Sequence, residues 1–301
     1  MKKIVIAGGS GFLGQVLSDY FVNQNYQVTI LTRNKTLKSN TINYCLWDAT
    51  TLGDWTTTLE NCDALINLCG KSVDCRYTDK NKELILQSRI QPTTLLGEAV
   101  RACKVPPKIW LNSSTATIYQ HSEQMPMTES KGVLGATFSE NVAKQWENSF
   151  FNCGTPQTRK VALRTSIVFG KTGGAFVPIK KLAQIGLGGK QGSGKQMISW
   201  IHELDFCRSI DYIINHNSLK GAINIVAPQV IKNTDFMRQL RNSLNLPFGM
   251  ALPKTVLELG ARLINTETEL ILKSRFVYPE ILLNHGFKFE YPDVASALEN
   301  L

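Results

Sequence analysis

Closely spaced glycines near the start of the chain have the spacing of a phosphate-binding turn. The run is Gly8, Gly9, Ser10, Gly11, Phe12, Leu13 and Gly14. It satisfies both G-x-G-x-x-G and G-x-x-G-x-x-G, in which early glycines let the backbone turn tightly and approach a pyrophosphate. The last glycine lets a helix pack closely on a strand, and free N–H groups at the helix start then bind the phosphates. The run therefore predicts a dinucleotide site.

The segments around these glycines supply the context that the motif requires. Residues 2–7 are a short Ile/Val-rich run that predicts a buried parallel strand, and apolar residues recur at helical spacing from Phe12 to Phe21. Val28 to Leu31 is a second apolar run. A β-α-β unit with the glycines in its first turn favours dinucleotide binding over a purely structural turn.

The end of the second predicted strand indicates which dinucleotide is bound. NAD sites place Asp or Glu about 20 residues beyond the glycines, where it accepts hydrogen bonds from the ribose 2′-hydroxyl. This chain has Thr32 and Arg33 there. A guanidinium suits a 2′-phosphate rather than a hydroxyl, so we expect NADP(H) to be preferred over NAD(H), with Arg33 as the main contact. The alternative for Arg33 is a solvated loop charge.

Strand and helix patterns continue to alternate along the chain. Strands are predicted at 44–47, 64–68, 109–113, 161–164 and 222–226, and helices at 52–60, 80–103 (interrupted at Pro92), 138–151, 176–185 and 204–214. This alternation predicts an α/β fold, a doubly wound parallel sheet of the Rossmann type with a smaller C-terminal α+β lobe. We expect residues 1–169 and about 200–227 to form the nucleotide domain. The substrate lobe would comprise about 170–199 and 228–301.

Motifs spread over nearly the whole chain make it similar to a known family. They are the glycine run, Asp48, Asn67-Leu68-Cys69-Gly70, Ser88-Arg89-Ile90, Leu187-Gly188-Gly189, Gly192-Ser193-Gly194-x-Gln196, Ser199-Trp200-Ile201-His202 with Asp205, and Phe276-Val277-Tyr278-Pro279. Together they resemble the extended short-chain dehydrogenase/reductase superfamily, which includes sugar-nucleotide epimerases and dehydratases. More narrowly, the chain resembles an epimerase-like family of unassigned activity that is sometimes labelled cell-division-inhibitor-like.

The resemblance implies further cofactor contacts. Asp48 would contact the adenine, and Asn67, Cys69 and Gly70 would line the nicotinamide-side phosphates and ribose. The remaining residues that we assign to the cofactor site are Ala49, Leu68 and Arg89.

The catalytic residues that the resemblance implies are only partly present. Extended members use a Ser or Thr near a strand end and a later Y-x-x-x-K, in which the tyrosine is the acid/base and the lysine lowers its pKa. Thr115 precedes Tyr119 as the superfamily pattern places its hydroxyl, and Lys144 is present, but Glu140 stands where the tyrosine is expected. Three interpretations remain open. Tyr119 could transfer the proton, Glu140 could do so if burial raised its pKa, or the chain could bind the cofactor without catalysis. Each of these side chains could also lack a catalytic role. Tyr119 would then be a structural tyrosine, Glu140 a solvated charge at a helix start, and Lys144 an exposed helix lysine.

The last third of the chain is expected to bind the substrate. We assign Lys195, His202 and Arg275 to this site, the arginine by analogy with the diphosphate-binding arginine of sugar-nucleotide enzymes. A hydrogen-bonded structural histidine and a helix-end arginine are the alternatives. The glycine-rich segment 186–194 either wraps an anionic group through its N–H donors or is a mobile surface loop. Residues 286–289 alternate and predict a small strand.

Composition excludes several other classes of protein. The chain has 301 residues and a formal net charge of +9 without a basic run, so no nucleic-acid partner is expected. No apolar stretch is long enough to span a membrane, and the one after Lys2 and Lys3 is too short for a signal peptide. Seven cysteines without a C-x-x-C pair and four scattered histidines indicate reduced thiols, no metal site and a cytoplasmic location. A homodimer is left open.

Two functions follow from these residues. The first is an NADP(H)-dependent oxidoreductase or epimerase-like enzyme that transfers hydride on a small, anionic, sugar-nucleotide-like substrate. The missing tyrosine keeps a second function open, a non-catalytic NADP(H) sensor that changes partners with cofactor state.

Overall fold

The computed structural model describes residues 1–263, 267 and 269–301 and confirms the α/β class. Its main sheet has seven parallel strands in the order β10-β6-β5-β4-β1-β2-β3. These are β1 (Lys3–Ala7), β2 (Gln27–Thr32), β3 (Ile42–Leu46), β4 (Ala64–Asn67), β5 (Ile109–Thr115), β6 (Arg159–Thr165) and β10 (Gly221–Ile225). The strand predicted at 222–226 thus joins this sheet at its edge, beside β6.

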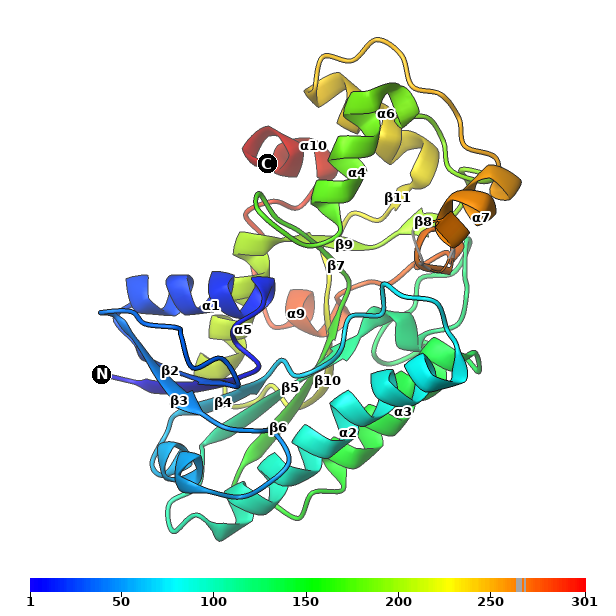
Figure 1. Cartoon of the computed structure of the whole chain (residues 1–301). Coiled ribbons are helices and arrows are strands. Elements are labelled where there is room, and N and C mark those ends of the chain that lie inside the picture. The colour runs from blue at the N-terminus through cyan, green and yellow to red at the C-terminus, as the bar shows by residue number, and fades with distance from the viewer. Residues whose placement is uncertain (264–266, 268) are drawn as a thin grey trace.

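Helices cover both faces of the main sheet. Figure 1 shows α1 (Phe12–Asn23) and α5 (Glu203–Asn215) on one face, and α2 (Asp79–Ala102) and α3 (Phe138–Phe151) on the other. Alternate residues of each strand enter the two cores, so Ile6 packs toward α1 and α5 while Val5 packs toward α2 and α3. Such two-sided burial is what requires nearly continuous apolar strands.

Strand register brings the ends of the central strands together. Ala7 of β1 pairs with Asn67 of β4, and Asn67 pairs with Asn112 of β5. Because the strands are parallel, the loops that follow β1, β4 and β5 leave from the same edge of the sheet. Ligands bind at this carboxyl edge in open α/β sheets.

The C-terminal lobe is built from short elements around its own aromatic core. The remaining strands are β7 (Ile167–Phe169), β8 (Met197–Ile198), β9 (Trp200–His202) and β11 (Ile231–Lys232), and the remaining helices are α4 (Phe176–Leu182), α6 (Asn233–Ser243), α7 (Lys254–Leu263), α8 (Glu269–Leu272), α9 (Glu280–Asn284) and α10 (Val294–Asn300). Of these, β7, β9 and α9 also pack on the core of the main sheet, through Val168, Ile201 and Leu282. β7 pairs with β9, and β8 pairs with β11. Phe169 lies 5.2 Å from Trp200 and 5.3 Å from Phe236, centroid to centroid. In Figure 1 this lobe stands over one end of the sheet.

Three short turns of helix complete the chain. They are η1 (Asp54–Leu59), η2 (Ala116–Ile118) and the wide turn η3 (Ala183–Leu187). No helix in the described residues is long and apolar enough to cross a membrane.

Two local predictions were wrong. The long helix α2 is not interrupted at Pro92 but runs from Asp79 to Ala102, because its buried face packs against the sheet and outweighs the cost of a helical proline. Residues 286–289 form no strand. Phe287 instead packs edge-on against Tyr212 of α5 and against Phe289, so the side chains rather than the backbone hold this segment.

Candidate active site

The glycine run forms a tight turn after β1 with two positions that admit no side chain. Gly8 has a φ of +73°, which favours glycine, and a Cβ there would lie 3.0 Å from both the N and the Sγ of Cys69. A Cβ on Gly14 would lie 2.3 Å from the Cα of Gly9. Gly9 and Gly14 therefore let α1 approach the end of β1 closely.

Gly11 differs from its neighbours because no contact requires a glycine there. Its φ is −85°, which any residue adopts, and a Cβ would meet nothing within 4 Å. Gly11 is the N-cap of α1, which has no acidic residue in its first turn and no side-chain cap. The unbonded N–H groups and positive dipole end of α1 thus face open space of the kind that a diphosphate would fill.

Phe12 and Leu13 belong to the turn but also pack internally. A Cβ on Gly170 or Gly173 would lie 2.3 or 2.4 Å from the Phe12 ring, so the loop after β7 encloses that ring. Leu13 packs against the core under α1, whereas Ser10 is exposed. The Phe12 side chain therefore anchors the glycine turn to the second lobe.

The end of β2 presents a cation to this edge. Thr32 is buried, and its Oγ1 accepts the N–H of Asn34 at 3.1 Å. Arg33 is exposed and forms no ion pair with a described residue. Burial raises the pKa of the Cys69 thiol to about 12, and the Arg33 charge opposes that rise.

Asp48 uses its carboxylate to fold the turn after β3. It accepts the N–H groups of Thr50 and Thr51 at 2.8 Å and the Thr51 hydroxyl at 2.6 Å, and these bonds hold its pKa well below the usual range. Ala49 follows with a φ of +66°. Asp48 thus has a clear structural role, and the adenine contact stays a prediction.

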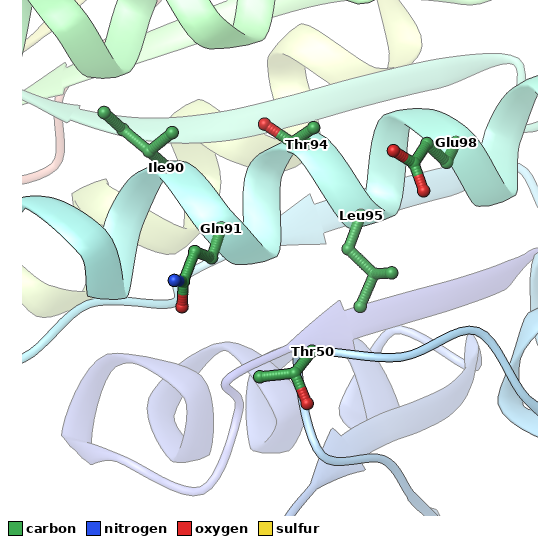
Figure 2. A pocket seen from close by; sticks show the side chains of 6 residues that line it. All are labelled: Thr50, Ile90, Gln91, Thr94, Leu95 and Glu98. Atoms are coloured by element: carbon green, nitrogen blue, oxygen red, sulfur yellow. The ribbon is translucent and has the colours of Figure 1, made fainter.

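A cavity of about 350 Å³ lies between this turn and α2. Its lining is Thr50, Ile90, Gln91, Thr94, Leu95 and Glu98. Figure 2 shows Gln91 and Leu95 directed from α2 toward Thr50. None of the predicted catalytic residues lines it, so this cavity is not part of the predicted reaction site.

Asn67 shapes the turn after β4 from inside the protein. It is fully buried, donates to Thr93 Oγ1 at 3.1 Å and Asn112 Oδ1 at 2.7 Å, and accepts the N–H of Cys69 at 3.0 Å. Leu68 donates its N–H to Ala7 at 2.9 Å. Asn67 thus uses both its amide donors and its carbonyl oxygen within the fold, and its predicted cofactor contact stays a prediction.

Arg89 lies directly beneath Gly70. A Cβ on Gly70 would be 3.3 Å from the Arg89 guanidinium carbon, which also lies 5.2 Å from the Trp146 ring centroid. Nη1 donates to the Ile85 carbonyl at 2.8 Å, and burial lowers the pKa of Arg89 to about 10. This cation has no carboxylate partner among the described residues, which suits an anionic ligand group.

Thr115 is the last residue of β5, which runs two residues beyond its predicted end, and its Oγ1 accepts the N–H of Thr117 at 3.1 Å. Tyr119 lies a few residues further but is only 2 % exposed. Its hydroxyl donates to Asn224 at 2.9 Å and accepts from Arg164 at 2.8 Å, and burial raises its pKa. The proton-transfer role considered for Tyr119 is not supported, because both hydrogen-bonding directions of its hydroxyl are used within the fold.

Glu140 sits in the first turn of α3, where it completes a capping box with Thr137. Its Oε1 accepts a hydrogen bond from Lys273 at 2.5 Å. Burial would raise the pKa of Glu140, but the bonds from Lys273 and Thr137 bring it below the ordinary value. The raised pKa that a general-acid role for Glu140 would require is therefore not found. Lys144 donates to the Gly135 carbonyl at 2.8 Å.

His202 is the N-cap of α5, not a residue open to a substrate. Its Nδ1 accepts the N–H of Leu204 at 3.1 Å, and its ring lies 3.9 Å from that of Tyr291. The side chain is buried, which lowers its pKa to about 4 and keeps it neutral. A substrate-binding role for His202 is thus not supported.

The two predicted substrate cations differ in their surroundings. Arg275 is buried and donates from Nε to the Thr117 hydroxyl at 3.0 Å. Thr117 is two residues beyond Thr115 in the sequence. Lys195 is exposed in the glycine-rich segment, with its N–H bonded to Ser193 at 3.2 Å. Only Arg275 approaches the predicted catalytic edge.

Several amides of the glycine-rich segment 186–194 are already bonded within the fold. Its N–H groups are bonded internally: Gly189 to Met250, Gly192 to Leu252 and Gly194 to Gln191, at 2.8–3.1 Å. The amide of Gln191 donates to Asn233 at 2.8 Å. The segment is hydrogen-bonded to residues 250–252, and the four bonded amides are not available to bind an anion.

Sequence reasoning missed the polar contacts that join the C-terminal lobe to the sheet domain. They are Arg76 with Glu267, Ser139 with Glu269, Glu140 with Lys273, and Thr117 with Arg275. The partners lie more than a hundred residues apart, so no local spacing signals them. Among the described residues, no group of three His, Cys, Asp or Glu side chains could hold a metal ion.

Comparison with known proteins decides the family. Residues 4–226 match the NAD-dependent epimerase/dehydratase family, and residues 252–301 match a domain of unknown function, DUF1731. The chain belongs to the NAD-dependent epimerase/dehydratase family. The first match spans the whole Rossmann domain up to β10, and the second covers the segment that supplies Lys273 and Arg275.

Relatives of this epimerase/dehydratase family chain match it from end to end. An epimerase family protein of Staphylococcus saprophyticus is 33% identical over 302 residues, covering 100% of this chain and 99% of the relative. One from Staphylococcus aureus is 30% identical over 303 residues with the same coverage.

Solved structures in the same family share the fold. The human epimerase family protein SDR39U1, solved with NADPH, superimposes with a TM-score of 0.88 at 26% identity, covering 99% of this chain and 98% of that chain. A nucleoside-diphosphate sugar epimerase from Corynebacterium glutamicum gives a TM-score of 0.79 at 25% identity, covering 99% of this chain and 57% of that one.

Proposed function

We propose that the protein is an NADP(H)-dependent oxidoreductase of the epimerase type. The observation that carries this proposal is the open N-terminus of α1 behind Gly11, beside Arg33 at the end of β2. Amide N–H groups suit a diphosphate, and a guanidinium suits an additional 2′-phosphate. The human relative solved with NADPH supports the same cofactor choice. When bound, the nicotinamide supplies or accepts the hydride.

The proposed substrate is small and anionic. Arg275 is a buried guanidinium that bonds Thr117, two residues beyond the end of β5, and Arg89 is a half-buried one beside Gly70, which follows β4. A negatively charged group, such as the diphosphate of a sugar nucleotide, would compensate them. Thr115, the last residue of β5, is proposed to orient the reacting oxygen.

Titration of the full chain with NADPH and NADH by calorimetry tests the cofactor proposal. We expect NADPH to bind at least about tenfold more tightly, because only NADPH gives Arg33 a phosphate to pair with. Equal affinities would contradict the NADP(H) preference. Absence of binding to either nucleotide would contradict the whole proposal.

A non-catalytic NADP(H) sensor remains the second candidate. Two observations favour it: Glu140 replaces the expected tyrosine and is ion-paired, and the Tyr119 hydroxyl is engaged in the fold. NADPH labelled with deuterium at nicotinamide C4 distinguishes the candidates when incubated with carbonyl compounds or cell extract. Stereospecific loss of deuterium supports an enzyme, whereas tight binding without loss supports a sensor.

A further inference from the structure

An ammonium group from the C-terminal lobe lies at the helix position where the superfamily pattern has its tyrosine. Lys273, which follows α8, donates from Nζ to Glu140 Oε1 at 2.5 Å and to the Thr117 carbonyl at 2.9 Å. The Lys273 and Glu140 side chains are 6% and 3% exposed. The second lobe therefore delivers a cation to the start of α3.

Glu140 is fixed in place on every side that the structure describes. Its Oε2 accepts the N–H of Thr137 at 2.5 Å, and its Oε1 accepts Lys273. A Cβ on Gly135 would lie 1.9 Å from the Glu140 carboxyl carbon, so the loop before α3 presses directly on the carboxylate. A carboxylate held in this way is suited to orient an ammonium rather than to move.

Lys273 has one N–H donor for which the described residues supply no acceptor. An ammonium has three N–H donors, and described residues accept two of them. Its titratable surroundings are Glu140 on α3, Glu269 and Arg275 on its own lobe, and His121, which bonds the neighbouring Ser274. Burial lowers the pKa of Lys273 and Arg275 lowers it further, while the two carboxylates oppose this; the net result is a lowered pKa. A lysine with a lowered pKa exchanges its proton more readily.

A chain of contacts places Lys273 at the predicted reaction edge. Lys273 bonds the carbonyl of Thr117, and the N–H of Thr117 bonds the hydroxyl of Thr115. Tyr119 uses its hydroxyl twice within the fold, and Lys144 bonds Gly135 in the loop before α3 rather than a residue that follows β5. Lys273 is thus the ammonium that contacts the turn directly after Thr115.

We propose that Lys273 transfers the substrate proton in this protein and that Glu140 is the residue that positions it, an inference that rests on the proposed function. For a carbonyl substrate, an N–H bond of Lys273 breaks and its electron pair stays on Nζ. The proton forms an O–H bond with the carbonyl oxygen, which takes the electron pair of the C=O π bond. The carbon receives hydride from a reduced pyridine nucleotide, the co-reactant. The Lys273 amine regains its proton from water, and the reverse reaction uses the amine as base.

The test measures the pKa of Lys273 in the full chain by NMR of ¹⁵N-labelled lysine side chains. Lys273→Arg and Lys273→Gln each identify the signal, so either variant suffices. Titrations are run with NADPH and with NADP⁺, which share their phosphates but differ by one positive charge on the nicotinamide ring. We expect NADP⁺ to lower the pKa of Lys273 by about one unit relative to NADPH, because the charged ring would lie near the ammonium. Lys108, paired with Asp63 where β5 begins, serves as the control and should not change.

The outcomes separate this inference from the proposed function. If both nucleotides raise the thermal stability of the protein but give Lys273 the same pKa, the lysine is a structural partner of Glu140 and the inference is wrong. If neither nucleotide binds, the proposed function is wrong, and the inference that rests on it is wrong as well. Glu140→Gln is expected to lower the pKa of Lys273 by about one unit, since it removes the stabilising carboxylate. An unchanged pKa in that variant would contradict the positioning role.

Discussion

Arg164 and Glu147 form a buried two-point ion pair between β6 and α3. Nε of Arg164 lies 2.9 Å from Oε1 of Glu147, and Nη2 lies 2.8 Å from Oε2. Ser114 adds a bond to the carboxylate at 2.6 Å, and the third guanidinium nitrogen bonds Tyr119. The pair therefore fixes the end of β5, which carries Thr115, against the helix that carries Glu140.

Breaking this pair should destabilise the fold strongly. Glu147→Ala leaves a buried guanidinium without its carboxylate, a change that costs about 3–5 kcal/mol of unfolding free energy. Urea unfolding followed by circular dichroism measures the loss. Arg238→Ala is the matched control, because Arg238 pairs with Asp235 on the exposed face of α6 and should cost less than about 1 kcal/mol. Equal losses of unfolding free energy in the two variants would show that the buried pair stabilises the fold no more than an exposed pair does.

Two alanine variants in the glycine turn should separate folding from binding. Gly14→Ala places a Cβ 2.3 Å from Gly9, so it should lower the unfolding free energy by several kcal/mol, about 3 or more. Gly11→Ala meets nothing within 4 Å and should cost less than about 1 kcal/mol. We expect Gly11→Ala nevertheless to weaken NADPH binding at least about tenfold, because the added methyl group occupies the phosphate side of the turn. Unchanged NADPH affinity would place the diphosphate elsewhere.

Arg33→Ala tests the choice between the two nucleotides. The variant should raise the Kd for NADPH at least about tenfold and leave the Kd for NADH unchanged, because only NADPH has the 2′-phosphate. Calorimetric titration of both ligands measures the ratio. Lys35→Ala, an exposed cation two residues later, is the control for a general charge effect. A similar loss for both variants would indicate nonspecific attraction.

Burial of His202 predicts a specific acid dependence of stability. Its pKa is lowered to about 4, so the unfolded state binds the extra proton between about pH 6.5 and 4, and stability falls as the pH falls through this window. His202→Asn keeps a side-chain cap for α5 and should flatten the fall by roughly 2–3 kcal/mol. Urea unfolding from pH 4 to 7 measures it.

Local patterns predicted the elements but not the contacts that assemble the site. Helix α3 begins at Phe138 and ends at Phe151, as the apolar spacing predicts, and the glycine turn follows β1 as expected. The Glu140–Lys273 pair joins residues 133 positions apart. Such a pair has no period or motif, because the packing of the second lobe on the sheet brings its members together. The hydrogen bonds of the Tyr119 hydroxyl could not be predicted from local spacing either, because its partners Arg164 and Asn224 lie on β6 and β10.

Tyr119→Phe should reduce stability without affecting cofactor binding. The change leaves the Arg164 donor and the Asn224 acceptor buried without their shared partner, which costs about 2–3 kcal/mol. NADPH affinity should stay within about twofold of the wild-type value, because the hydroxyl is enclosed by β6, β10 and the loop before α3 rather than exposed at the glycine turn. Unfolding in urea and calorimetric titration are run on the same preparation. A stable variant would show that the tyrosine hydroxyl is not part of the buried network, and the proton-transfer role considered for it would return.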